Sequence, residues 1–147
     1  MKCDNYVKLT VPALSRNESY ARAAVGAFVS QLDPTLDELG SVKAAVSEAV
    51  TNCVVHAYAE SDTVGIINIT ARIKGEEVYI KITDKGCGIE DIKKAMEPLF
   101  TTKPELERSG LGFAVMESCC DKVKVSSMVG KGTTVTLTFR FDKKVLK

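Results

Sequence analysis

The chain has 147 residues, 45% of them hydrophobic, and is expected to form a single domain, residues 1–147, around one core. Its formal net charge of +1 gives no reason to expect bulk electrostatic binding to nucleic acid or to a membrane surface. No apolar run approaches the about 20 residues that cross a bilayer, and the N-terminus lacks the apolar core of a signal peptide, so we expect a cytoplasmic protein.

The N-terminal part of the chain is expected to form a strand followed by a helix. Apolar residues alternate with polar ones from position 7 to position 11, which predicts a half-buried strand that ends at Pro12. Ser15, followed three residues later by Glu18, fits a capping box at a helix start. The apolar face of that helix would extend to Leu32.

A second helix and a hairpin are expected next. Asp33-Pro34 matches an N-cap followed by proline at the first helical position, and an apolar stripe then runs from Leu39 to Ala57. Alternating apolar residues over positions 67–73 and 78–82 flank a turn at Gly75. This pattern predicts a β-hairpin.

The segment from Asp84 to Gly112 is rich in glycine, proline, threonine and charge, and one short helix is expected near positions 89–96. A loop this long in a compact domain is usually functional, often as a lid. A helix beginning at Gly112 and strands over 123–127 and 133–141 complete the chain. This order favours an α+β fold, a two-layer sandwich of a mixed, mostly antiparallel sheet with helices on one face.

The five cysteines are odd in number and form no C-x-x-C pair. This pattern favours buried, reduced thiols over a disulfide framework or a zinc site.

Glu48, Asn52 and His56 recur at intervals of four residues, so the predicted helix places them on one face, at the rim of its apolar stripe. An amide oxygen such as that of Asn52 suits Mg²⁺. A carboxylate one turn away can take a proton from an attacking hydroxyl. The spacing alone is more typical of a solvated helix face, and only the glycine motifs downstream favour a site.

Asp84 follows a predicted strand directly and precedes Gly86 and Gly88. A carboxylate at a strand end can accept a hydrogen bond from an exocyclic amine such as that of adenine, and glycines let the backbone approach a flat ring. A tight turn explains the same residues equally well.

Gly110 and Gly112 flank the start of a predicted helix, where free N–H groups and the helix dipole suit a polyphosphate. A capped helix after a solvated loop is the alternative. Thr133 could line a base pocket, although strand propensity explains it as well. Upstream donors and positive charges come from Thr101, Thr102, Lys103, Arg108 and Ser109.

Three motifs together resemble the N, G1 and G2 boxes of the GHKL ATPase and kinase superfamily: Glu48-x-x-x-Asn52, Asp84-x-Gly86-x-Gly88 and Gly110-Leu111-Gly112-Phe113. Longer segments, at positions 17–22, 31–38, 47–52 and 98–110, resemble the sporulation anti-sigma F factors, a family of serine-protein kinases. The likeness covers nearly the whole chain and is most specific in the long loop.

The resemblance implies an ATP-dependent serine kinase of the GHKL, or Bergerat, fold with ATP, ADP and Mg²⁺ as ligands. Members of that family hold sporulation sigma factor F inactive. They also phosphorylate a serine of an anti-anti-sigma factor, which releases the sigma factor when it is unphosphorylated. The family further implies a homodimer.

The resemblance also implies roles for individual residues. Glu48 would be the catalytic base, Asn52 the Mg²⁺ ligand and Asp84 the adenine reader, while Arg108 would approach the terminal phosphate. The remaining nucleotide-binding positions would be Gly86, Gly88, Thr101, Thr102, Ser109, Gly110, Leu111, Gly112, Phe113 and Thr133.

Glu18 and Arg22 match positions on the partner-docking surface of the family. Their spacing of four residues is also that of an ordinary solvent-facing helix pair. Ala57 stands where the family often has glycine, and this departure is expected to touch no assigned role.

Three other functions are alternatives to this one. A sensor histidine kinase needs a phosphoacceptor histidine on a separate hairpin, whereas the single histidine, His56, lies in the predicted nucleotide helix. A module that sequesters a partner without chemistry has no need of a base at Glu48. A stress-response anti-sigma kinase belongs to the same class, but the long loop and the N-terminal segments favour the sporulation branch.

Overall fold

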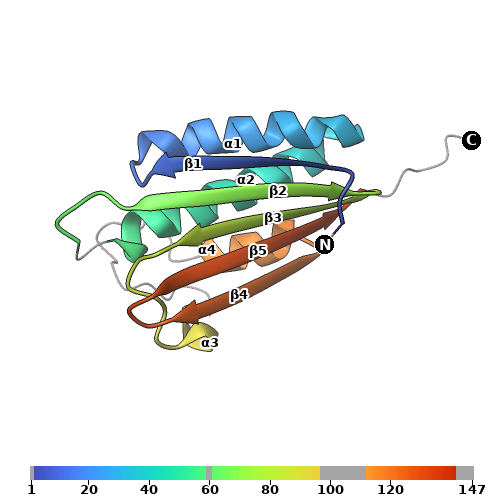
Figure 1. Ribbon diagram of the computed structural model, residues 1–147. Helices are drawn as coiled ribbons and strands as arrows, with labels where there is room; N and C mark the ends of the chain where they lie inside the picture. The colour runs from blue at the N-terminus through green and yellow to red at the C-terminus, as the bar shows by residue number, and fades with distance from the viewer. Residues whose placement is uncertain (1, 59–60, 97–111, 142–147) are drawn as a thin grey trace, which may run out of the picture.

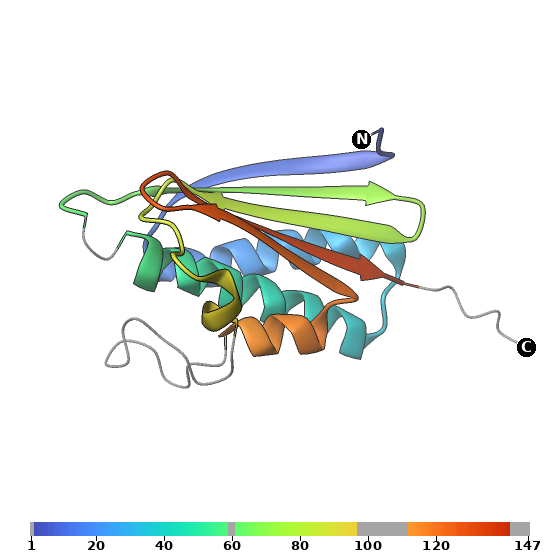
Figure 2. The same ribbon diagram turned by 90° about the horizontal axis from the view of Figure 1, so that it is seen from below.

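A five-stranded sheet forms one layer of the molecule and helices form the other, as the two views in Figures 1 and 2 show. The computed structural model describes residues 2–58, 61–96 and 112–141. The strands are ordered β1-β2-β3-β5-β4, and all four neighbouring pairs are antiparallel, so the expected mixed sheet is a wholly antiparallel one. Their bounds are β1 Asn5–Pro12, β2 Ile66–Lys74, β3 Glu77–Asp84, β4 Lys122–Met128 and β5 Gly132–Arg140.

The helices cover a single face of this sheet (Figure 2), which confirms the predicted α+β sandwich. Helix α2 packs against both α1 and α4 and so occupies the middle of the helical layer. The bounds are α1 Arg16–Val29, α2 Leu36–Asn52, α3 Ile92–Ala95 and α4 Gly112–Cys119, with a short 3₁₀ turn at Ser30–Leu32.

The core lies between the two layers. Alternate residues of the inner strands are fully buried, and a stripe of valines on α2 meets them. This packing holds α2 firmly against the sheet, so that its C-terminal end lies beside the end of β3. The buried residues include Val42, Val46, Val50, Ile67, Ile69, Ile80, Ile82 and Leu137.

Helix α1 begins directly after Ser15, as predicted, but the predicted capping box does not form, and the predicted start of α2 is wrong. Ser15 has helical backbone angles and its side chain makes no cap, and the Glu18 carboxylate, the other half of the predicted box, pairs with Arg22. Thr35, not Asp33, caps α2: its hydroxyl accepts from the Glu38 N–H at 3.1 Å, and the Glu38 carboxylate accepts from the Thr35 N–H at 2.8 Å. This reciprocal box satisfies two backbone donors at once, which explains the shift of two residues.

The apolar stripe predicted one continuous helix to residue 57, but α2 ends at Asn52 and continues as a π-helical turn, Cys53–Ala57. Such turns are rare and occur often at functional sites. The wider turn carries the Ala57 carbonyl to the loop after β3, where it accepts a hydrogen bond from the Cys87 N–H at 2.8 Å.

The predicted short helix is α3, which Asp91 caps through the Lys94 N–H at 3.1 Å. Residues 97–111 of the expected lid lie outside the described residues. All five cysteines are free thiols as expected, but only Cys53 is buried, and Cys87 is exposed. Within the described ranges no helix has the length and apolarity that crossing a membrane requires.

Candidate functional site

A cavity of about 880 Å³ lies on the helical side of the sheet, between the end of α2, the loop after β3, α3 and the start of α4. Its volume falls in the range of small-molecule and cofactor sites. The predicted site residues in its wall come from four separate segments of the chain. They are Asn52, Asp84, Gly88, Gly112, Phe113 and Thr133, and His56 joins them.

Asp84 is held in place by the backbone around it. The side chain is only 6% exposed, and its Oδ1 accepts hydrogen bonds from the Gly86 N–H at 2.9 Å and the Thr133 N–H at 3.3 Å. From the described residues its Oδ2 receives only the weak thiol donor of Cys53, at 3.5 Å. Burial raises the pKa of the Asp84 carboxyl. Oδ2 therefore keeps acceptor capacity for a ligand donor.

The two glycines of the G1 motif allow close backbone approach. A Cβ on Gly86 would lie 2.1 Å from the Ala57 carbonyl oxygen, and Gly88 has φ +79° with the Met128 carbonyl 2.4 Å from its would-be Cβ. Ala57 therefore does touch an assigned position, contrary to expectation, because the π turn carries its backbone and methyl group against Gly86.

Replacing Gly86 by alanine should test this contact. The new methyl group would meet the Ala57 carbonyl, so we expect the free energy of unfolding to fall by about 1–3 kcal/mol. The control is Gly40→Ala on α2, where a Cβ meets nothing within 4 Å and helix propensity predicts a gain of about 0.5–1 kcal/mol. Urea denaturation measures both variants; equal stability of the two would contradict the close approach.

Asn52 carries an unsatisfied polar atom. Its amide Nδ2 is buried and has no hydrogen-bond partner within the described part of the chain, although the residue lines the cavity. Leaving such a group unpaired costs about 1–3 kcal/mol. The same amide can turn its oxygen to that position, and Mg²⁺ prefers oxygen ligands together with substrate phosphates. The residue therefore fits a bound metal–nucleotide complex.

Glu48 lies one helical turn before Asn52 and is half-buried. It is not among the described residues in the cavity wall, so of the three residues predicted to share a face only Asn52 and His56 line it. One helical turn is about 5.4 Å along the axis, so Glu48 lies about that much farther than Asn52 from the end of α2 that borders the cavity. Its role as base remains a prediction.

Six predicted nucleotide-binding residues lie outside the described residues. They are Thr101, Thr102, Arg108, Ser109, Gly110 and Leu111.

Tyr58 is a structural element of the site that sequence reasoning missed. Its hydroxyl accepts from the Lys85 N–H at 2.8 Å and donates to the Ile66 carbonyl at 2.6 Å, which ties the π turn to two strand ends. Gly65 leaves room for the ring, since a Cβ there would lie 2.3 Å from it. Burial raises the pKa of the Tyr58 hydroxyl. No local pattern in the sequence identifies these long-range bonds.

Ser127 is a second missed residue. Its hydroxyl accepts from the Ile89 N–H at 2.7 Å and lies 2.7 Å from the Thr133 hydroxyl. It thereby fixes the loop after Gly88 to the strand that carries Thr133.

Glu18 and Arg22 were expected to face solvent, but both are partly buried, with 22% and 41% of their side chains exposed. They form an ion pair at 2.9 Å, and the same Arg22 nitrogen lies 3.4 Å from the Ser47 hydroxyl on α2. The pair therefore connects α1 to α2 at Ser47, the residue that precedes Glu48.

Comparisons with known proteins show the family of the chain. A family model described as "Histidine kinase-like ATPase domain" matches residues 11–139. The chain is 55% identical to the anti-sigma F factor of Anoxybacillus flavithermus, over 95% of this chain and 94% of that protein. It is 54% identical to the anti-sigma F factor of Clostridium kluyveri, over 95% and 96% of the two chains.

Two solved structures are similar in fold alone. One contains the RsbU and RsbW domains of Rv1364c from Mycobacterium tuberculosis, with a TM-score of 0.70 and 21% identity over 96% of this chain and 34% of that one. The other is the histidine kinase domain of the blue-light activated kinase EL346 from Erythrobacter litoralis, with a TM-score of 0.59 and 17% identity over 89% of this chain and 62% of that one.

Proposed function

The chain belongs to the histidine kinase-like ATPase domains and, within them, to the anti-sigma F factors, and we propose that it is a serine kinase that inhibits sporulation sigma factor F. In this proposal the chain binds the sigma factor and uses ATP to phosphorylate, and thereby inactivate, an anti-anti-sigma factor. The observation that carries the proposal is the buried Asp84, whose Oδ2 remains an available acceptor in the wall of the cavity that Asn52 also lines.

Asp84 is the proposed adenine reader. Because the Gly86 and Thr133 N–H groups hold Oδ1, Oδ2 is left to accept from the exocyclic amine of the base. A hydrogen bond from a neutral amine to a charged acceptor contributes about 1.5–3 kcal/mol. The same rigid backbone gives the carboxylate a single orientation, which favours adenine over a base that presents an acceptor at this position.

Asn52 is the proposed Mg²⁺ ligand through its amide oxygen. Bound Mg²⁺ would offset the negative charge of the phosphates during transfer. The N–H groups at the start of α4, beginning with Gly112, would face the phosphate chain. Arg108, in the segment outside the described residues, is proposed to make a charge-assisted contact with the terminal phosphate.

Glu48 is the proposed general base. It would accept the proton of the substrate serine hydroxyl as that oxygen bonds to the terminal phosphorus of ATP. The bond from this phosphorus to the bridging oxygen breaks, and ADP leaves. We propose that the protein works in the cytoplasm as a homodimer.

One alternative function has a specific observation in its favour. Glu48 is not in the described wall of the cavity. This position suits a module that binds ATP and sequesters the sigma factor without phosphoryl transfer, because such a module needs no base beside the nucleotide. A stress-response anti-sigma kinase is the other alternative, and the RsbW domain in a structural neighbour shares that fold.

Co-elution of purified proteins tests the proposed partner. We expect the chain to form a complex with sigma factor F in the presence of ATP, and we expect the unphosphorylated anti-anti-sigma factor to release the sigma factor from it. A chain that binds ATP but retains neither protein would contradict the proposed function. Retention of a stress-response sigma factor alone would favour the second alternative.

Replacing Arg22 by alanine should weaken binding of the sigma factor, the anti-anti-sigma factor or both by at least about tenfold, as the loss of a docking arginine does. Its ion pair and its contact with Ser47 are partly solvent-exposed, so the stability loss should stay below about 1 kcal/mol. Lys8→Ala, an exposed change on the opposite layer, is the control. Surface plasmon resonance with ATP present measures both variants, and wild-type affinity of Arg22→Ala for both partners would remove it from the docking surface.

A further inference from the structure

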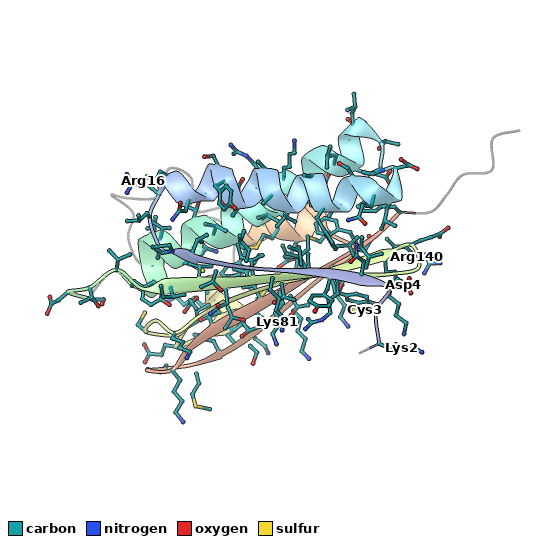
Figure 3. All side chains as sticks on the ribbon, turned by 45° about the horizontal axis from the view of Figure 1, so that its top comes forward. Lys2, Cys3, Asp4, Arg16, Lys81 and Arg140 are labelled. Carbon is teal, nitrogen blue, oxygen red and sulfur yellow. The ribbon has the colours of Figure 1, made fainter. Side chains whose placement is uncertain are left out.

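The face of the sheet that the helices leave uncovered is strongly positive. Alternation along the strands places seven lysines and arginines on this face, against one carboxylate, Glu77. Figure 3 shows Lys81 on this side, away from the helices. Because the whole chain has a net charge of only +1, the remainder of the molecule is net negative. The small net charge of the chain therefore does not reflect the charge of this face.

Three lysines lie in one row across the sheet. The register aligns Lys8 with Thr70, Thr70 with Lys81, Lys81 with Thr136, and Thr136 with Lys124. Lysine thus recurs on every second strand, with backbone separations of about 10 Å from two interstrand spacings. Within the described part of the chain no carboxylate pairs with any of the three lysines.

Part of this row borders a shallow hollow of about 290 Å³. Its walls supply two ammonium groups and three hydroxyl groups, all of which can donate hydrogen bonds. The lining residues are Lys81, Lys124, Ser126, Thr134 and Thr136. Such a set of donors suits the oxygens of a phosphate group.

Protection of sheet edges does not explain this pattern. Lysines on edge strands discourage aggregation, and Lys8 and Lys124 lie on the edge strands β1 and β4. Lys81 and Arg72, however, lie on inner strands. Glu77, the one carboxylate that the five described strands place on this face, is already neutralised by Arg140 at 2.9 Å.

The composition of the face favours nucleic acid over a protein partner. Protein interfaces are built on apolar and aromatic anchors and are depleted of lysine and serine. The exposed aliphatic residues of this face, Ile66 and Met128, lie at one end of the sheet, away from the lysine row. Its exposed aromatic residue, Tyr6, lies beside the row, with the Lys8 ammonium 5.9 Å from its ring centroid. Phosphate contacts are made by lysine, arginine, serine, threonine and asparagine, and interfaces with DNA are polar and positive. A second copy of the same face would bring like charges together.

We propose that the uncovered sheet face is a sequence-independent binding surface for the phosphate backbone of nucleic acid. It lies on the opposite side of the sheet from the candidate nucleotide cavity, so this inference goes beyond the proposed function and does not rest on it. Contacts of this kind give dissociation constants of about 10⁻⁴–10⁻⁶ M at physiological salt. With about three to five phosphates contacted, log K should fall with log salt at a slope of roughly −3 to −4.5.

Fluorescence anisotropy with a labelled DNA duplex of arbitrary sequence, and with a single-stranded RNA, tests the proposal across a salt series. Lys81→Glu/Lys124→Glu should weaken binding at least about tenfold and reduce the salt slope by about two. The control, Arg16→Glu/Lys43→Glu, makes the same change of net charge on the helical layer and should have a much smaller effect. ATP affinity reports the fold of each variant, and Lys81→Gln/Lys124→Gln replaces the first pair if it fails to fold.

Three results would overturn the proposal. The first is a wild-type protein that binds neither nucleic acid at low salt. The second is an equal loss in both double variants, which would show that only net charge matters. The third is binding of phosphatidylserine vesicles or polyglutamate in preference to both nucleic acids, which would assign the face to a membrane or to an acidic protein.

Discussion

Replacing Glu48 by glutamine is expected to lower the rate of phosphoryl transfer to the partner serine by about 10²–10⁴, the usual effect of removing a general base. Glutamine keeps the shape of the side chain but cannot take the proton of the attacking hydroxyl. Because Glu48 is not in the described wall of the cavity, ATP affinity and sigma-factor binding should stay close to wild type.

Single-turnover transfer with saturating ATP measures this effect apart from nucleotide binding. Glu117→Gln, an exposed change on α4, controls for the lost negative charge. Glu48→Gln with an undiminished rate would exclude Glu48 as the base. A wild-type protein that binds ATP and sigma factor F but transfers no phosphate would instead favour the sequestering module.

Replacing Asp84 by asparagine is expected to weaken ATP binding by roughly tenfold to a hundredfold, the effect of losing one hydrogen bond and leaving a group unsatisfied. The asparagine oxygen can still accept from the Gly86 and Thr133 N–H groups that hold Oδ1. Its NH₂ group then replaces Oδ2 and opposes the amine of adenine. The change should therefore affect base recognition more than the local fold.

Titration calorimetry of ATP measures this loss, with exposed Asp37→Asn as the control. The proton linkage offers a second readout. Burial raises the pKa of the Asp84 carboxyl, and the proposed contact uses the deprotonated form, so wild-type affinity should fall as pH falls through that raised pKa. Asp84→Asn should lack this dependence. Unchanged affinity of Asp84→Asn near neutral pH would refute the adenine contact.

The sheet and the main helices follow from the periodicity of the sequence. Strands such as β2 and β3 alternate strictly between core and solvent, and a period of two is a direct mark of a half-buried strand. The start of α1 after Ser15 was predicted correctly, but the start of α2 was not, because both Asp33 and Thr35 could cap it. Thr35 caps α2 because it exchanges two hydrogen bonds with Glu38. The Asp33-Pro34 pattern had favoured Asp33 as the cap.

The candidate site could be predicted only as far as its local motifs reach. The sequence motifs at Asn52, Asp84 and Gly88 predicted residues that do meet at one cavity. Local motifs could not predict the π-helical turn, the hydrogen bond between the Tyr58 hydroxyl and the Lys85 N–H, or the contact of Ala57 with Gly86. Each depends on bonds between segments far apart in the chain, which no local spacing encodes.

Transfer of phosphate from ATP to the anti-anti-sigma factor tests the central claim most directly. The measurement is intact-mass spectrometry of that protein after incubation with the chain, ATP and Mg²⁺, followed by mapping of the modified residue. We predict one added phosphate on a serine, and no transfer when Mg²⁺ is removed by chelation. An unmodified partner, under conditions where calorimetry shows that ATP is bound, would contradict the assignment of the chain as a serine kinase.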